Sequence, residues 1–495
     1  MKFRFLLFVL ISAGPHNFLW GREGAALTVT SAASHQIIAV IDHGVHLRYG
    51  CVYPLTYQID FPPAVTGLIA LHRKSQADAW TALPEKQSSD RFNAIEAVRF
   101  DYATNRAYIS ASFFGTGDSL FLQITDGSGT PLPVTYGGIS TYYDNRRSVV
   151  TVTADDWGDW TMDWYLSLLT LFRSRGLYVS AGLMSGPEYL SSPSWQVIQK
   201  ELDSGYLEMA AHSRSHPYTP YADPYGEVAG CYDDIVNNLT LPPLSRVNGT
   251  GYVYVWLAPY GDYDATVDSL LSVRGYLVPR LVQTGGSAFS AWDESRKHFA
   301  PITLTLELGA PSWGGGTTDP ATLNASFDAV AGQGGIFHMM WHPQVIYPDR
   351  DQTYLLTFLN YISGRRSVWY VNLGHLYLYH LLQQSADVAI AEVPSDRPLP
   401  DKIELYQNFP NPFNPTTTIR YALPQKEYVS LTVFTVVGQR VATLVNREQE
   451  AGVHEAHFDG GGLASGVYFF RLDARSMEGG GGVTHVETKR LMLLR

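Results

Sequence analysis

The sequence predicts a multidomain protein in which a central α/β unit is flanked by two β-rich units. Three observations support this prediction. At 495 residues the chain is longer than one ordinary domain. Strand and helix patterns alternate between residues 145 and 385, whereas residues 27–140 and 403–495 show strand patterns alone. Repeated βα units imply a parallel sheet, either open or closed into a barrel.

The first 26 residues have the composition of a secretory signal peptide. Lys2 and Arg4 precede an apolar run from Phe5 to Ile11, and small residues follow it. This run is far shorter than the roughly 20 residues that cross a bilayer, so we expect cleavage and export rather than anchoring. No later stretch of the sequence has the length and apolarity of a transmembrane helix.

Residues 27–140 show the alternation of half-buried strands. Apolar and polar side chains alternate over residues 55–61. A second alternation, at residues 98–102, is separated from residues 108–114 by a short turn, which predicts a hairpin. We interpret this region as a β-sandwich accessory domain. It contains no cluster of potential ligands, so an accessory binding or packing role is expected.

Polar side chains in residues 145–385 follow the predicted strands of the α/β unit. They occur at Asp155-Asp156, at His212 to His216, at Pro259-Tyr260-Gly261 and at His342. In an α/β barrel the carboxyl ends of the strands form one face, and active sites are built there. We therefore expect these four groups to meet at one face.

Composition narrows the class of ligand. A formal charge of −11 argues against a nucleic-acid partner. Two cysteines, Cys51 and Cys231, exclude a disulfide scaffold and a Cys-rich metal site. Aromatic residues make up 13% of the chain, which fits either a carbohydrate site or a Tyr-rich β-domain. The sequence does not separate these two interpretations.

The stretch Val149–Trp160 places two carboxylates after a run of β-favouring residues. Val and Thr suit a buried strand, whereas adjacent buried charges are costly. We therefore expect the strand to end before Asp155, with both acids facing a site. A helix N-terminus is the alternative, since Asp159 could cap the next helix, but that explains Asp159 better than the pair.

The spacing of His212 and His216 places both rings on one side of a helical turn. Two histidines and a carboxylate from another strand form a three-ligand metal site with open positions. One of the two aspartates would bind the metal, and the other would accept a proton from the bound water. Imidazole suits zinc, nickel, copper or iron, and zinc is the expected ion.

Two further groups fit hydrolysis at such a site. His342 is the candidate acid for the leaving group. His338, on the same strand face, is interpreted as a core histidine. Backbone N–H groups near Tyr260, after Pro259, are candidates for binding a developing oxyanion or the substrate.

Residues 148–384 resemble the NodB-type polysaccharide deacetylases, carbohydrate esterases with a distorted (β/α) barrel. The motif T-F-D-D-G of that family is similar to Thr153–Trp157, and H-[ST]-x-x-H is matched by His212–His216. The resemblance implies that Asp155 is the catalytic base and that Asp156, His212 and His216 bind a divalent metal. It also implies that Ser213 steadies the loop.

Two motifs of this family differ here. R-x-P-Y is matched only in part, because Leu257 stands where the family has Arg. The family Arg orients the catalytic Asp, so another residue must replace it or activity is low. The motif with Asp and Trp has only a loose candidate in Ala291–Asp293, whereas the acid motif resembles Trp341–Pro343. The resemblance implies removal of N- or O-linked acetyl groups from a polysaccharide or peptidoglycan-like substrate.

The end of the chain is similar to a second family. Residues 386–402 are Pro-rich without periodicity and are interpreted as a linker. Residues 403–495 open with LYQNFPNPFNP and resemble a type IX secretion C-terminal sorting domain, which implies a β-sandwich recognised by the secretion machinery. We expect transport through the periplasm of a gram-negative bacterium to the medium or the outer cell surface.

Two rival functions remain open from sequence. A surface glycan-binding protein that kept the fold but lost catalysis is favoured slightly by Leu257. A glycosidase would need two carboxylates roughly 5–10 Å apart on either side of the bond, which adjacent Asp155 and Asp156 do not suit. The glycosidase also leaves the two histidines unexplained.

Overall fold

The computed structural model describes most of the chain after residue 34. The described residues are 35–41, 48–49, 53–75, 77–87, 94–113, 119–241, 252–310, 316–346, 352–391, 402–408, 411–449, 452–476 and 484–494. The predicted signal peptide and Cys51 lie outside these residues. Cys231 is buried and unpaired. No helix in the described part of the chain combines the length and apolarity that a bilayer requires.

The N-terminal domain consists of two antiparallel sheets that share one hydrophobic core. Their strand orders are β20-β1-β7-β3-β4 and β5-β6-β2-β8. The predicted hairpin is confirmed, because β5 and β6 pair in antiparallel register. The strand bounds are β1 Gln36–Ile41, β2 Leu55–Asp60, β3 Ile69–Arg73, β4 Thr81–Ala82, β5 Ala97–Asp101, β6 Arg106–Ala111, β7 Ser119–Thr125 and β8 Thr135–Ile139.

The predicted linker begins later than the sequence indicates. Residues Ala386–Ala391 form β20, which pairs antiparallel with β1. The chain therefore returns to the N-terminal domain after crossing the central one, and the remainder of the predicted linker, residues 392–401, lies outside the described residues. Local composition predicted a linker because the pairing partner of β20 is about 350 positions away, and sequence patterns do not reveal such a distant partner.

The central domain is built on one parallel sheet. Its strand order is β16-β13-β12-β11-β10-β9-β18-β17, and β19 also pairs with β9. Most of these strands are buried along their whole length, as expected for a parallel sheet covered on both faces. The bounds are β9 Ser148–Trp157, β10 Val179–Leu183, β11 Leu207–Ala211, β12 Val255–Leu257, β13 Val278–Thr284, β16 Ile302–Leu304, β17 Leu306–Leu308, β18 Ile336–Trp341 and β19 Val368–Tyr370.

The sheet closes through a single residue. Strands β16 and β17 end the sheet on opposite sides but are separated only by Thr305. The Thr305 N–H donates to His338 O at 2.7 Å, and the His338 N–H donates to Thr305 Oγ1 at 3.0 Å. One extended segment therefore pairs with β13 at its start and with β18 at its end. This closure gives the distorted barrel that the sequence resemblance implied.

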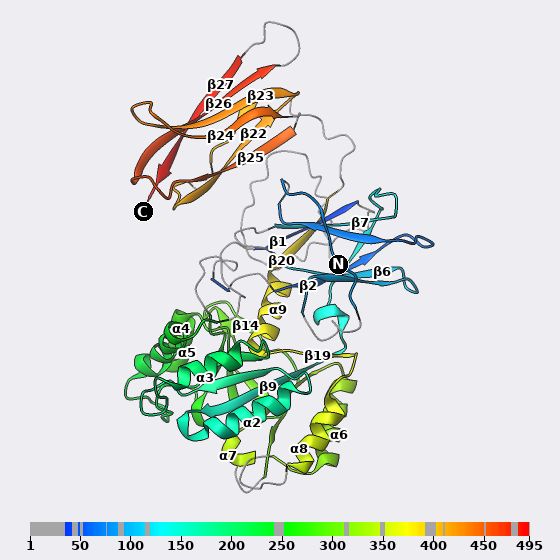
Figure 1. Cartoon of the computed structure of the whole chain (residues 1–495), viewed down its shortest axis with the longest axis vertical. Coiled ribbons are helices and arrows are strands. Elements are labelled where there is room, and N and C mark those ends of the chain that lie inside the picture. Colours follow the sequence, from blue (N-terminus) through cyan, green and yellow to red (C-terminus); the bar gives the residue numbers. More distant parts are fainter. Residues whose placement is uncertain are drawn as a thin grey trace, which may run out of the picture.

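Helices pack around this barrel (Figure 1). Their ends follow local signals: Asp264 accepts hydrogen bonds from the first turn of α5, and Gly275 ends that helix with a φ of 86°. The bounds are α2 Met162–Arg173, α3 Ser194–Leu202, α4 Cys231–Asn238, α5 Ala265–Arg274, α6 Pro320–Gly332, α7 Pro343–Ile346, α8 Thr353–Ile362 and α9 Leu373–Ser385. A short two-stranded sheet, β14 Trp292–Asp293 and β15 His298–Phe299, lies beside the barrel.

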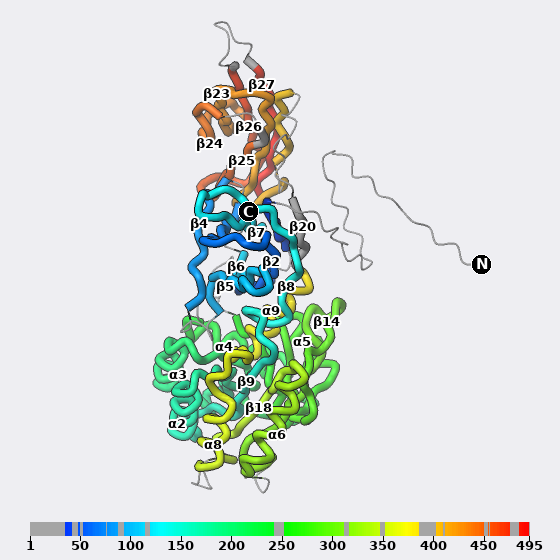
Figure 2. The backbone as a smooth tube through the Cα atoms, turned by 90° about the vertical axis from the view of Figure 1, so that its right-hand side faces the viewer, coloured from blue at the N-terminus to red at the C-terminus, as the bar shows by residue number. Residues whose placement is uncertain are grey.

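The N-terminal domain packs against the end of the barrel where β9 begins (Figures 1 and 2). Tyr379 of α9 donates a hydrogen bond to Ser140 O at 2.8 Å, and Tyr142 donates to Gly334 O at 3.0 Å. Apolar residues of α9 belong to the same core cluster as those of the two N-terminal sheets. The opposite end of the barrel, where β9 ends, therefore faces away from this domain.

The C-terminal domain has its own core, made of a three-stranded and a four-stranded antiparallel sheet. Its all-β content agrees with the strand patterns of residues 403–495. The bounds are β21 Glu404–Leu405, β22 Thr416–Leu423, β23 Glu427–Thr435, β24 Arg440–Gln449, β25 Gly452–Asp459, β26 Gly466–Ser476 and β27 Thr484–Leu493.

Candidate metal centre

A bulge in β9 turns two adjacent carboxylates to one side. The strand continues through Asp155 and Asp156 to Trp157, so the prediction that it ends before the pair was wrong. Both acids oppose the single residue Gly182 of β10, and Asp156 has a φ of 62°. A bulge re-aims side chains that would otherwise alternate between faces. A Cβ at residue 182 would lie 2.8 Å from the Leu257 side chain and 3.1 Å from Ala154 O, so a larger residue there would displace its neighbours.

The two metal-candidate histidines come from a loop after β11, not from a helical turn as predicted. Ser213 and His216 have φ values of 64° and 55°, which reverse the chain within five residues. The His216 N–H donates to Ser213 Oγ at 2.9 Å. The rings of His212 and His216 still lie close together, with their centroids 4.7 Å apart, because the reversal of the loop brings both side chains to the same side.

Glu227, which sequence reasoning missed, holds this loop from outside. One carboxylate oxygen accepts the N–H groups of Arg214 and Ser215 at 2.8 and 2.9 Å. The Arg214 guanidinium donates twice to Asp234, at 2.7 and 2.8 Å. These polar contacts anchor the loop to the segment that runs into α4, and the sequence offers no local pattern that would reveal them.

Asp156, His212 and His216 bring three ligand atoms together. His212 Nε2 and His216 Nε2 each lie 3.2 Å from Asp156 Oδ1, and the two nitrogens lie 3.1 Å apart. Ligands about 2.0–2.2 Å from a tetrahedral zinc ion are themselves roughly 3.3 Å apart. His212 Nδ1 donates to Leu257 O at 2.8 Å, which leaves Nε2 as the metal-binding atom. The donor set and its spacing therefore fit a divalent cation.

Arg280 replaces the arginine that the resemblance leads one to expect at residue 257. In the sheet register Leu257 of β12 is the direct partner of Arg280 on β13. The fully buried Arg280 guanidinium donates to Asp155 Oδ1. Burial raises the pKa of Asp155, but the charge of Arg280 and the nearby histidines outweigh burial and lower it below its usual value. Asp155 is thus held as a carboxylate.

His342 lies across the site from the loop histidines. Its Nε2 is 3.8 Å from Asp155 Oδ2 and 3.9 Å from Asp156 Oδ2, and its Nδ1 donates to Glu307 at 2.8 Å. Burial lowers the pKa of His342, but Glu307 and the two aspartates raise it to about 9. Glu307 of β17 therefore contacts the candidate acid. Asp293, which belongs to the loose motif candidate Ala291–Asp293, is exposed and accepts a hydrogen bond within a turn.

Two further residues complete the immediate surroundings. The Gln344 side chain, two residues after His342, donates to Asp156 Oδ2 and so orients the third ligand. His338 is buried beneath the site, 3.3 Å from Thr153 Oγ1, and burial lowers its pKa to about 3. His338 is therefore a neutral core residue, as its depth on the strand predicted.

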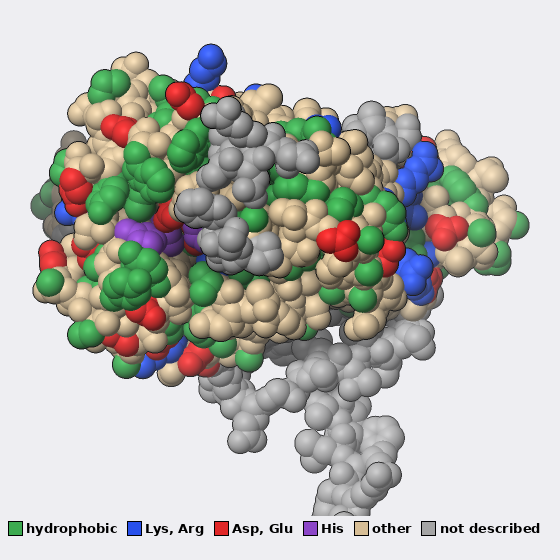
Figure 3. Space-filling model, turned by 90° about the horizontal axis from the view of Figure 1, so that it is seen from below, with side chains coloured by type: hydrophobic (Ala, Val, Ile, Leu, Met, Phe, Trp, Pro, Cys, Tyr) green, Lys and Arg blue, Asp and Glu red, His purple; other side chains and the backbone are tan. Residues whose placement is uncertain are grey.

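An exposed tyrosine pair forms one rim of the site. Pro259 is buried, and Tyr260 follows it with a φ of 56°. The Tyr260 ring lies 4.4 Å from the His216 ring and stacks on Tyr218 with 3.7 Å between centroids. Tyr218 and Tyr260 are 62% and 46% exposed, so both offer apolar surface to solvent. Figure 3 shows histidine side chains in a hollow on this end of the molecule.

The fold and this cluster define a (β/α)-barrel protein with an Asp-His-His group at the carboxyl ends of its strands. The barrel is followed by an export domain. Residues 407–478 match the family model described as a secretion system C-terminal sorting domain, which confirms the predicted type IX sorting domain. Among curated proteins, none is similar enough to match this chain.

Several solved structures are similar to part of this chain. A protein named as a polysaccharide deacetylase from Mycobacterium smegmatis has 14% identity and a TM-score of 0.37, covering 52% of this chain and 96% of its own. One from Pseudomonas aeruginosa PAO1 has 12% identity and a TM-score of 0.37, covering 48% and 92%. BA3943, a CE4 family pseudoenzyme from Bacillus anthracis, has 14% identity and a TM-score of 0.30, covering 48% and 66%. Such distant similarity does not decide activity, which depends on the site.

Proposed function

We propose that this protein is an exported, metal-dependent deacetylase that removes N- or O-linked acetyl groups from a polysaccharide. One observation carries the proposal. A three-atom ligand set with spacings of 3.1–3.2 Å has the buried Asp155 carboxylate within 4 Å of it, and the His342 imidazole lies within 4 Å of that carboxylate. Metal, base and acid each have their own residue in this arrangement.

Asp156, His212 and His216 would hold the cation, most simply zinc. A divalent cation bound there would acidify a water molecule and polarise the acetyl carbonyl. Gln344 keeps the Asp156 carboxylate turned toward the histidines, and Leu257 O keeps the His212 ring in the required tautomer. These partners make the ligand set rigid before a cation arrives.

Asp155 is the proposed base. Its Oδ2 lies 3.9 Å from His212 Nε2, close to the ligand set, whereas Oδ1 is occupied by Arg280. The Arg280 contact fixes the carboxylate orientation and leaves Oδ2 to accept a proton from the attacking water. Arg280 thereby takes the orienting role that the resemblance assigned to an arginine at residue 257.

His342 is the proposed acid. Glu307 accepts a hydrogen bond from Nδ1–H, and its negative charge stabilises the protonated ring, whose Nε2–H faces the site. An imidazolium there can protonate the departing amine or alcohol when the acetyl bond breaks. Asp155 and His342 thus serve the two proton transfers that hydrolysis requires.

The turn at Pro259 and Tyr260 is proposed to bind the substrate. Among the described residues, no acceptor is found for the Tyr260 backbone N–H, which can therefore stabilise a developing oxyanion. The stacked rings of Tyr218 and Tyr260 present apolar faces beside the ligand set. A sugar ring has similar apolar faces, so this rim supports a glycan substrate.

Export places the substrate outside the cell. We propose that the signal peptide and the sorting domain carry the enzyme through the periplasm to the medium or the outer surface, and that both flanking two-sheet domains are β-sandwiches. Removing residues 403–495 should leave the protein in the periplasm of its host. Cell fractionation measures this, and unchanged surface delivery would contradict the role of the tail.

Metal analysis combined with acetate release tests the enzymatic proposal. The purified chain should contain about one equivalent of divalent metal and release acetate from chitin oligomers, peptidoglycan or acetylated xylan. Asp155→Asn should retain the metal but lose activity, with kcat falling by roughly 10²–10⁴. His212→Gln should lose both. A chain that binds no metal and releases no acetate from any of these substrates would refute the proposal.

A catalytically weak glycan-binding protein is the alternative. Leu257 was the feature that favoured it, since the arginine of the family motif is missing there. Arg280 on the neighbouring strand removes that reason. Glycan affinity without acetate release would select this alternative.

A further inference from the structure

A cleft lies between the N-terminal domain and the barrel, at the opposite end of β9 from the metal centre. It has a volume of about 430 Å³ and is lined by Lys86, Arg99 and residues 144–147 and 366–367, with Gln87 at its edge. Ser148 begins β9 beside it, so at ~3.3 Å per residue the cleft lies roughly 20–25 Å from Asp155. It is a site separate from the proposed active site.

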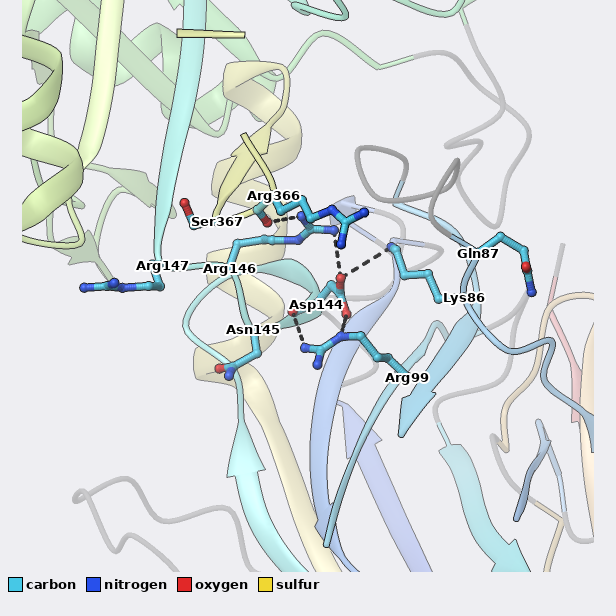
Figure 4. A pocket seen from close by; sticks show the side chains of 9 residues that line it. All are labelled: Lys86, Gln87, Arg99, Asp144, Asn145, Arg146, Arg147, Arg366 and Ser367. Atoms are coloured by element: carbon cyan, nitrogen blue, oxygen red, sulfur yellow. Dashed lines mark hydrogen bonds and ion pairs between the residues drawn. The ribbon is translucent and has the colours of Figure 1, made fainter. Parts of the chain in front are cut away.

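Four cations converge in this cleft around one carboxylate (Figure 4). Arg99 Nε and Arg146 Nη2 donate to Asp144 at 3.0 and 2.8 Å, and Lys86 Nζ lies 3.8 Å from it. Arg366 joins them from the turn before β19, where its backbone carbonyl accepts from Arg146. Arg147 also lines the cleft, so the described lining residues carry five cations and one carboxylate, a formal charge of +4, in a chain whose total charge is −11.

Arg366 has no carboxylate partner within this cluster. Its side chain is exposed, and no carboxylate among the described residues pairs with its guanidinium. Figure 4 shows this guanidinium next to that of Arg146. Like charges held together cost free energy, which an oxyanion between them would offset. Guanidinium groups match carboxylate and phosphate oxygens in geometry as well as charge.

The backbone holds these cations in place. Asp144 and Asn145 have φ values of 52° and 54°, in the left-handed region that few residues adopt, and the Asp144 N–H donates to Thr56 Oγ1 at 2.8 Å. Asp144 thus fixes Arg99 from β5 and Arg146 from the connector in one position. Residues kept in such conformations are concentrated at sites that bind ligands.

We propose that this cleft binds the oxyanion of an acidic glycan, either a sugar carboxylate or a sugar phosphate. That the oxyanion belongs to a glycan rests on the proposed function, whereas the preference for an anion rests on the cleft alone. The volume is in the range of small-ligand sites and accommodates a sugar unit with its charged group. Binding there would tether a polymer to the enzyme at a second point, far from the acetyl group being removed.

Calorimetric titration of the full chain tests this proposal with three probes. An oligogalacturonide carries carboxylates, glucose 6-phosphate carries a phosphate, and a neutral cello-oligosaccharide carries neither. At least one charged probe should bind, and its affinity should fall as ionic strength rises. The charged probe that binds identifies the source of the oxyanion. Equal affinity for the neutral probe, or no binding of either charged probe, would overturn the proposal.

Arg366→Gln should weaken binding of the charged probe about tenfold, and Arg366→Glu should weaken it further. Arg440→Gln, an exposed arginine on β24, is the charge-matched control and should bind normally. Unchanged affinity in Arg366→Glu would also overturn the proposal. Asp155→Asn should bind as the wild type does, so a failed deacetylase assay and a failed anion site remain distinguishable.

Discussion

The Arg280 guanidinium contacts the Asp155 carboxylate inside the barrel, although the two residues are 125 positions apart in the chain. Arg280 is the register partner of Leu257 on the neighbouring strand. An arginine can therefore approach this aspartate from either strand, because both side chains start at the same level of the sheet. The arginine contact that the motif leads one to expect from residue 257 comes from Arg280, one strand away.

Removing the arginine at residue 280, and then placing one at residue 257 instead, tests this relationship. Arg280→Met should lower kcat by about 10–100-fold and keep the metal, because Asp155 loses the donor that orients it and keeps it ionised. The double variant Leu257→Arg with Arg280→Met should regain part of that activity. Acetate release and metal content measure both effects.

Folding is the control for this pair. A buried aspartate without its partner destabilises a protein by about 3–5 kcal/mol, so thermal unfolding of each variant must be compared with the wild type. If Arg280→Met folds, binds metal and retains full activity, Arg280 does not orient the base.

Glu307 should control the alkaline limit of activity. An acid must be protonated to act, so the rate falls as pH rises through the pKa of His342. Burial lowers that pKa, but Glu307 and the two aspartates raise it to about 9. Glu307→Gln keeps a hydrogen-bond acceptor but removes the charge, so the falling limb of kcat should move to lower pH by about one unit. Zinc-loaded wild type and variant are compared, and coincident pH profiles would contradict this role.

The exposed tyrosine rim should affect substrate binding more than chemistry. Tyr218→Ala removes one ring of the stacked pair without removing a metal ligand or a proton donor. KM for a glycan oligomer should rise about fivefold, as expected for ~1 kcal/mol of aromatic contact, while kcat changes little. Tyr218→Phe is the matched control and should behave as the wild type. A fall in kcat alone would show that the ring acts on the reaction step.

Glu208, a buried carboxyl group on β11, should make the free energy of unfolding depend on pH. Glu208 Oε2 accepts hydrogen bonds from Ser180 Oγ at 2.6 Å and from the Gly374 N–H at 3.0 Å. Burial raises its pKa from 4.5 to about 7, even though both hydrogen bonds act in the opposite direction. Between these pH values the folded chain binds a proton that the unfolded chain has lost. The contribution of Glu208 to stability is therefore full below about 4.5 and is lost as pH rises to about 7.

Glu208→Gln should remove this dependence and stabilise the barrel at pH 8 by up to about 3 kcal/mol relative to the wild type. Thermal unfolding at pH 5 and pH 8 measures the difference. Glu448→Gln, at an exposed position of β24, is the control and should follow the wild type at both pH values. Parallel curves for the wild type and Glu208→Gln would show that Glu208 does not titrate in this range.

The sequence predicted the alternation of strands and helices in the barrel where apolar runs end at polar residues. Strands β11 and β18 end directly before the predicted polar residues His212 and His342, because strand composition acts locally. The histidine loop was predicted as a helical turn, because two histidines four residues apart in the sequence can lie on one side of either a helix or a loop. Only the left-handed residues Ser213 and His216 distinguish the two.

By itself the sequence predicted the chemical groups of the candidate site, which are two adjacent carboxylates, a pair of histidines and a distant histidine, and it predicted the sorting tail. Tertiary structure decided which residues serve those groups. Arg280 and Glu307 reach the site from strands β13 and β17 and Gln344 from helix α7, and no local sequence pattern predicts these contacts. The same holds for the cleft between the N-terminal domain and the barrel, where Lys86 and Arg366 lie close together only because the two domains pack against each other. Folding brings these positively charged side chains together, although they are far apart in the sequence.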